Sequence, residues 1–180
     1  MVRVFAFGAN MSSRVLARRR IAPARGEPAC LHDHRLAFDQ AGIPLVEPAF
    51  ASIVPAPGRV VWGALYDLTE ADVARLDRYE TTDYVPVEVP VVGAQSGPTT
   101  ARAYRTRRPV AERRPSARYL ALLCEGAREH GLPAEYVQDL AARPSAYVPV
   151  LSEVMTASIR GIEWLFQMGV GNRPRGRRAS

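Results

Sequence analysis

The chain opens with Val2-Arg3-Val4-Phe5-Ala6-Phe7-Gly8-Ala9-Asn10-Met11-Ser12-Ser13, and we expect the fold to be organised around this stretch. Residues 2–7 alternate between two faces, which predicts a β-strand. Gly8 and Asn10 both tolerate positive φ, and Ser12 or Ser13 would cap a short helix over residues 14–20. A turn of this kind leaves several main-chain N–H groups pointing one way, which favours a phosphate or a carboxylate. An ordinary strand-to-helix turn is the alternative, and spacing alone does not decide between them.

The composition is that of a globular domain. The 180 residues are 47% hydrophobic and 23% charged, enough for one sizeable core. No apolar run reaches the roughly 20 residues that span a bilayer, and no basic and apolar N-terminal signal is present. Cys30 and Cys124 lie far apart without metal-site spacing, so we expect neither a disulfide framework nor a metal. A reducing, cytoplasmic setting is the expectation.

The basic residues of the chain are all arginines, and the net charge is +6. They cluster at residues 18–20, 105–118 and 173–178. Such clusters attract nucleic acid or anionic membranes, so an arginine-driven nucleic-acid binder is one hypothesis. No nucleic-acid motif accompanies them, however, and we expect neither partner.

Hydrophobic periodicity predicts a mixed α/β (α+β) chain. We expect strands over residues 31–38, 50–54, 59–68, 84–92 and 99–106, the last two joined as a hairpin, and a solvated basic loop over 107–114. We expect helices over 70–80 and 116–130, one from 132–134 onward, and a long amphipathic helix over 148–166 that covers the core or pairs with another chain as a homodimer. His32 and His34 would share a strand face; a metal is the alternative, but no third ligand is evident.

Glu80 is the candidate catalytic group. In the helix over 70–80, with Thr69 as N-cap, it shares a face with Val73 and Leu76, while Asp72 lies on the solvent side. A carboxylate on an apolar face is either paired, or desolvated with a raised pKa suited to proton transfer. Alternatively, Glu80 lies beyond the last helical turn, in solvent.

Three separated stretches resemble the γ-glutamylcyclotransferase family. Phe5-Ala6-Phe7-Gly8-Ala9-Asn10-Met11 is similar to its FAYGSN[LM] loop. Val61-Trp62-Gly63-Ala64-Leu65-Tyr66, then Leu76-Asp77-Arg78-Tyr79-Glu80 and Tyr84, resemble its strand-and-helix segment ending at the catalytic Glu. Pro115-Ser116-Ala117-Arg118-Tyr119 through Gly131-Leu132-Pro133 to Tyr136 is similar to its PSxxY…GLPxxY segment. The resemblance implies a small mixed-strand β-barrel with surrounding helices over residues 1–143. It does not cover the rest of the chain, where periodicity and composition predict a helical extension over 144–168 packed on the barrel and a flexible basic tail over 169–180.

The resemblance also implies a chemistry. Members cleave γ-glutamyl amides by internal attack, a lyase- or acyltransferase-type cyclisation that gives 5-oxoproline and a free amine without metal or cofactor. Glu80 would then be the general acid/base, and Tyr119 a substrate-binding residue. The other substrate-binding residues implied are Phe5, Ala6, Phe7, Gly8, Ala9, Asn10 and Met11.

Two positions depart from the family pattern. Phe7 stands in place of the usual Tyr, and Ala9 in place of the usual Ser. These losses are tolerable if the loop binds substrate through its backbone. They also motivate a second hypothesis, a non-catalytic binding module on the same fold, which a salt bridge between Glu80 and an arginine would favour.

Overall fold

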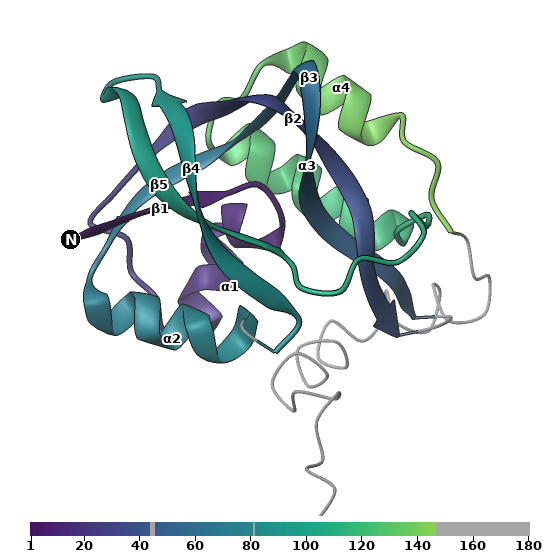
Figure 1. Ribbon diagram of the computed structural model, residues 1–180, viewed down its shortest axis with the longest axis horizontal. Helices are drawn as coiled ribbons and strands as arrows, with labels where there is room; N and C mark the ends of the chain where they lie inside the picture. Colours follow the sequence, from purple (N-terminus) through teal and green to yellow (C-terminus); the bar gives the residue numbers. More distant parts are fainter. Residues whose placement is uncertain (44–45, 81, 147–180) are drawn as a thin grey trace, which may run out of the picture. The chain divides into compact units, whose positions relative to one another are not determined.

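The computed structural model describes residues 1–43, 46–80 and 82–146. Five strands close into a barrel in the order β1-β3-β2-β4-β5 (Figure 1). The strands are β1 (Val2–Ala6), β2 (Arg25–Ile43), β3 (Glu47–Leu68), β4 (Tyr84–Gly93) and β5 (Gly97–Thr106). Because β1 runs antiparallel to β3 and parallel to β5, the barrel is mixed, which confirms the predicted fold class.

Strands β2 and β3 are far longer than predicted. The separate strands expected over 50–54 and 59–68 are one strand, β3, which pairs with β2 from Ile43↔Glu47 to Arg25↔Asp67. Two register shifts and a positive φ of 74° at Gly58 let this ladder bend without ending, so its prolines do not divide it. One shift lies between His32 and His34, so the regular strand alternation from which we predicted a shared face for the two histidines is interrupted there. Within the described ranges, no three His, Cys, Asp or Glu side chains gather as a metal site.

In the described part of the chain, the α-helices that pack around the barrel are α1 (Ser13–Arg18), α2 (Glu70–Glu80), α3 (Ala117–Glu129) and α4 (Ala134–Ala141). Thr69 Oγ1 accepts from Asp72 N at 3.1 Å, and Ser116 Oγ accepts from Tyr119 N at 3.0 Å, so both predicted caps are confirmed. The prediction that Asp72 faces solvent is wrong. Its carboxylate is buried because Thr69 and Arg75 satisfy it at 2.8 and 2.7 Å.

The core fills the barrel and continues under α3. Two glycines allow close backbone approach at the place where β1 ends. A Cβ on Gly63 would lie 2.2 Å from the Ala6 carbonyl oxygen, and one on Gly126 would lie 2.8 Å from Met11 Cβ. Strand β3 therefore packs closely against the last residue of β1, and helix α3 packs closely against the segment that follows it.

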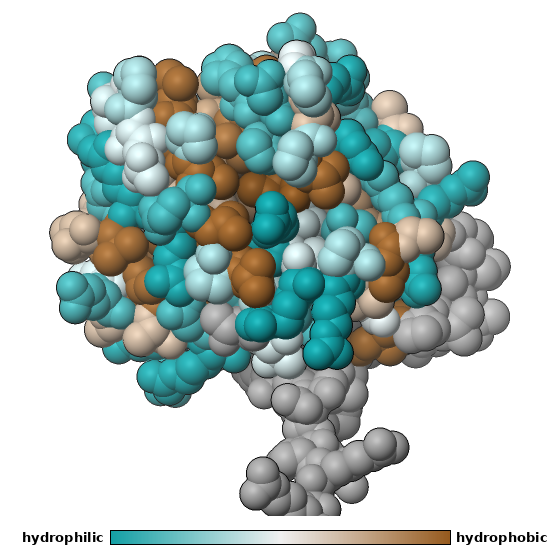
Figure 2. Space-filling view, viewed as in Figure 1, coloured by the Kyte–Doolittle hydropathy of each residue, from teal (hydrophilic) through white to brown (hydrophobic). Residues whose placement is uncertain are grey.

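The surface of this unit is mixed in polarity. Hydrophobic residues show between hydrophilic ones over the strands (Figure 2). Of the helices in the described ranges, none has the length and apolarity needed to cross a bilayer. The helix predicted over 148–166 lies outside the described residues, and the division of the chain at 143 and 168 stays a prediction.

Candidate active site

The first part of the site is the loop that leaves β1. Residues Ala9–Met11 form a single 3₁₀ turn, η1, in which Met11 N donates to Gly8 O at 3.0 Å. Among the described residues, the N–H groups of Gly8, Ala9 and Asn10 have no backbone carbonyl partner, and the Ala9 N–H is directed at the Tyr119 hydroxyl oxygen. They belong to the loop whose main-chain donors we predicted to favour an anion.

The predicted substrate-binding residues divide into two groups. Gly8, Ala9 and Asn10 are half-buried, at the accessible part of the loop. The others point into the core: the side chains of Phe5, Ala6, Phe7 and Met11 are all buried. The Phe7 ring lies 6.1 Å from the Phe5 ring, centroid to centroid, so the residue that replaces the usual Tyr serves here as core packing.

Two side chains hold the loop in place by binding the carbonyl oxygen of Met11. Tyr66 Oη donates to it at 3.0 Å, and His130 Nε2 lies 2.9 Å from the same oxygen. Tyr66 comes from β3 and His130 from the end of α3, so two elements distant in sequence hold one carbonyl group. Sequence reasoning missed this role of both residues, although both belong to the stretches that resemble the family.

Glu80 lies at the C-terminal end of α2 and is 9% exposed. Its Oε1 accepts from Arg19 Nη1 at 2.6 Å and from Asn10 Nδ2 at 3.2 Å. Arg19 Nη1 also donates to Asn10 Oδ1 at 2.8 Å, which closes a triangle of three side chains. Of the alternatives that the sequence left open, the structure shows a buried, paired carboxylate, in contact with the loop through Asn10.

Arg19 completes this cluster, and sequence reasoning missed it. The only signal was the arginine run at residues 18–20, which we interpreted as surface charge. Arg19 follows α1, its guanidinium carbon lies 4.7 Å from the centroid of the Tyr79 ring, and its side chain is 10% exposed. Ring stacking and the ion pair together immobilise the guanidinium beside Glu80.

Two tyrosine hydroxyls form another wall of the site. Tyr119 Oη accepts from Ala51 N at 3.2 Å, and a Cβ on Gly8 would lie 3.3 Å from that same oxygen. Tyr84 Oη donates to Ala51 O at 3.0 Å. Burial raises the pKa of both hydroxyls well above the usual range, so both stay neutral. Tyr119 is therefore a core aromatic residue whose hydroxyl lies against the loop, and Tyr84 lies near it, a residue to which we assigned no role from the sequence.

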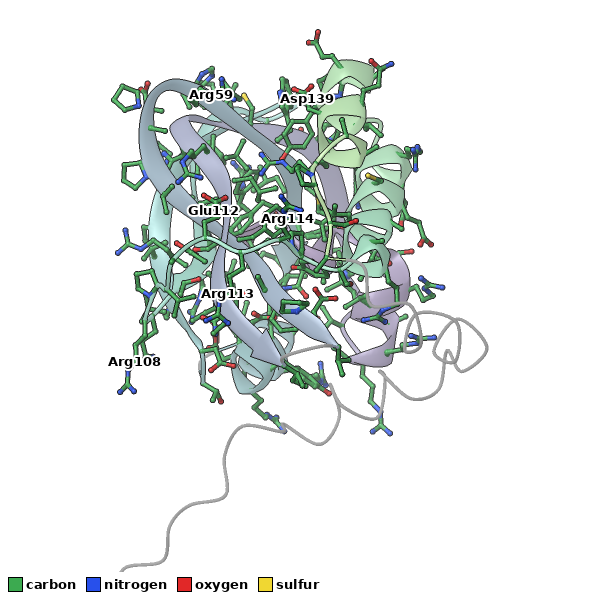
Figure 3. All side chains as sticks on the ribbon, turned by 90° about the vertical axis from the view of Figure 1, so that its right-hand side faces the viewer. Arg59, Arg108, Glu112, Arg113, Arg114 and Asp139 are labelled. Carbon is green, nitrogen blue, oxygen red and sulfur yellow. The ribbon has the colours of Figure 1, made fainter. Side chains whose placement is uncertain are left out.

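A cavity of about 220 Å³ lies elsewhere, between the connection after β5 and the end of α4. Figure 3 shows Glu112 and Arg114 over the strands and Arg108 pointing away from the molecule. The connection over residues 107–114, which we predicted as a solvated loop, is largely exposed. It is also anchored to β2, because Val110 N donates to Asp39 O at 2.9 Å and Arg113 N donates to Phe38 O at 3.0 Å. This cavity contains no part of the Glu80 cluster.

Comparison with known proteins points to one family. Residues 60–140 match the AIG2-like family model. The chain is 30% identical to a γ-glutamylcyclotransferase of Bos taurus over 156 residues, covering 83% of this chain and 82% of the relative. It is 31% identical to the γ-glutamyl cyclotransferase gliK of Claviceps purpurea, covering 89% of this chain and 72% of the relative. A solved structure titled γ-glutamyl cyclotransferase superposes with a TM-score of 0.71 at 26% identity, covering 87% of this chain and 98% of that one.

Proposed function

The chain belongs to the γ-glutamylcyclotransferase family, and from this premise we propose that it is an enzyme cleaving a γ-glutamyl amide by intramolecular cyclisation. The α-amine of the glutamyl group attacks its own γ-carbonyl carbon. One C–N bond forms, the amide C–N bond breaks, and the products are 5-oxoproline and a free amine or amino acid. The reaction needs no water, but two protons leave the attacking ammonium nitrogen. One goes to solvent or to the released amine, and the other must pass to the leaving nitrogen.

Glu80 is the group proposed to move that proton. An ammonium has no lone pair and cannot attack, so a base removes a proton from it first; an amide expels its nitrogen only once that nitrogen is protonated. A single carboxylate performs both transfers if it lies beside both nitrogens. Five-membered ring closure supplies the proximity, worth roughly 7–11 kcal/mol in well-oriented cases.

The loop is proposed to hold the glutamyl end of the substrate. The N–H groups of Gly8, Ala9 and Asn10 would bind the α-carboxylate or stabilise the oxyanion that develops at the attacked carbonyl. Tyr119, which lies against Gly8, would donate its hydroxyl proton to the same end. The observation that carries this proposal is the 3.2 Å contact of Asn10 with Glu80, because it brings the acid/base into contact with the loop.

A non-catalytic binding module is the second candidate function, and the structure provides one observation in its favour. The ion pair between Arg19 and Glu80 engages one oxygen of the carboxylate that should act as base. In such a module the loop would bind a γ-glutamyl group, and no bond would break.

Product formation separates the two functions. The purified chain is incubated with a panel of γ-glutamyl amino acids and amines, and 5-oxoproline is measured by mass spectrometry. We expect product from at least one substrate, and a rate loss of about 10²–10⁴ in Glu80→Gln, which keeps the shape but loses the basicity. Glu70→Gln, an exposed change on the same helix, is the matched control. Binding without product across the panel, or a fully active Glu80→Gln, would refute the enzyme.

A further inference from the structure

We propose that Arg19 is a positioning residue of the active site, which directs one oxygen of Glu80 toward the substrate. This inference rests on the proposed function. Every hydrogen bond that the described residues make to the Glu80 carboxylate ends on Oε1. Arg19 and Asn10 occupy Oε1 from two sides, so the lone pairs of Oε2 stay available to a ligand.

The cluster also fixes the direction in which Oε2 points. A carboxylate held through one oxygen by two donors loses the free rotation of its terminal torsion. Asn10 belongs to the loop, and Arg19 is stacked on the Tyr79 ring, so the orientation of Glu80 is coupled to the position of the loop. A substrate amine bound by the loop would thus meet Oε2 in one geometry.

The positive charge of Arg19 affects the second half of the reaction. In the first half, Glu80 accepts a proton from the substrate ammonium. After that transfer the guanidinium, which stays protonated, faces a neutral carboxyl group and loses its ion pair. Delivery of the proton to the leaving nitrogen restores the pair, so Arg19 favours this second step.

The other groups around Glu80 do not supply that charge. Tyr84, Tyr104 and Tyr119 lie close enough for Glu80 to affect their ionisation, and they come from β4, β5 and α3. Burial raises the pKa of each of these hydroxyls, so they are neutral at any pH where the enzyme would work. Arg19 is the cation that the described part of the chain places in contact with Glu80.

The test uses Arg19→Gln, which keeps a hydrogen-bond donor for Oε1 but removes the charge. We expect kcat for 5-oxoproline formation to fall about 10²-fold with KM little changed. Arg19→Lys keeps the charge, so much of kcat should return, again with KM little changed. Arg14→Met, which removes an exposed ion pair from α1, the helix that Arg19 follows, is the control.

The outcomes distinguish the two proposals. An active chain whose Arg19→Gln variant keeps its kcat would overturn the role of Arg19 and leave the enzyme in place. A chain that forms no 5-oxoproline from any substrate overturns both. Circular dichroism establishes folding. Should Arg19→Gln fail to fold, a change in KM without a change in kcat in Arg19→Lys would overturn the proposal, and a small fall in kcat at unchanged KM would support it.

Discussion

Gly63→Ala tests how tightly the loop depends on its neighbours. The added Cβ would lie 2.2 Å from the Ala6 carbonyl oxygen and 2.8 Å from the Phe5 ring, and real Cβ contacts are not shorter than 3.0 Å. Strand β1 must therefore move away from β3, just before the loop begins. Replacing glycine by alanine in a strand gains about 0.5–1 kcal/mol, whereas overpacking costs about 1–3 kcal/mol. We expect a net loss of about 1–2 kcal/mol in the free energy of unfolding.

Thermal and urea unfolding measure this loss, which corresponds to a fall in Tm of about 2–8 °C for a domain of this size. Because the displacement reaches the loop, we also expect kcat/KM for 5-oxoproline formation to fall about 10²-fold. Gly93→Ala is the control: its one contact shorter than 3.0 Å is with the Ser96 hydroxyl, which can rotate aside, whereas Gly63→Ala meets a backbone oxygen, so Gly93→Ala should cost less. A Gly63→Ala chain as stable as the unmodified one would refute the close approach of β1 and β3.

Three further predictions concern stability. Ser116→Ala should lower the free energy of unfolding by about 1–2 kcal/mol, because Ser116 caps α3 and donates to the buried Glu47. Ser12→Ala should be near neutral, because Ser12 Oγ has no partner among the described residues. Urea unfolding compares the two variants. Arg19→Met alone should destabilise the chain more than Arg19→Met with Glu80→Gln, because the single change leaves a buried carboxylate unpaired; a double-mutant cycle measures the coupling. Stability should fall above about pH 10, because five tyrosines of the described chain, three buried and two partly buried, have raised pKa values. They stay protonated when folded while the unfolded chain ionises, so the folded state binds more protons; melting curves from pH 8 to 11 check the sign.

Local patterns predicted the elements whose causes are local. The first strand, both helix caps at Thr69 and Ser116, and the helix ending at Glu80 follow from neighbouring residues, and the structure has them all. The burial of Glu80 followed from its spacing with Val73 and Leu76, because side chains three and seven residues apart share a helix face.

The features that the sequence did not predict depend on contacts between residues far apart in the chain. Whether Glu80 was paired could not be predicted, because its partner Arg19 lies 61 residues away and looked like one member of a surface run. The continuity of β3 through its prolines was equally hidden, since pairing with β2 sustains the strand where its own residues would end it. Ser12 occupies the cap position of α1 but makes no side-chain bond there, because contacts elsewhere bury it.

The position of β1 in the barrel has a consequence for how the chain is made. Val4 is the residue of β1 whose partner across the closing seam is Arg102. On a ribosome that adds roughly 5–20 residues per second, the first strand waits on the order of 5–20 s before that partner has even been synthesised. Throughout this interval a nascent chain carries an unpaired strand edge, which makes it a natural client for chaperones that bind near the exit tunnel.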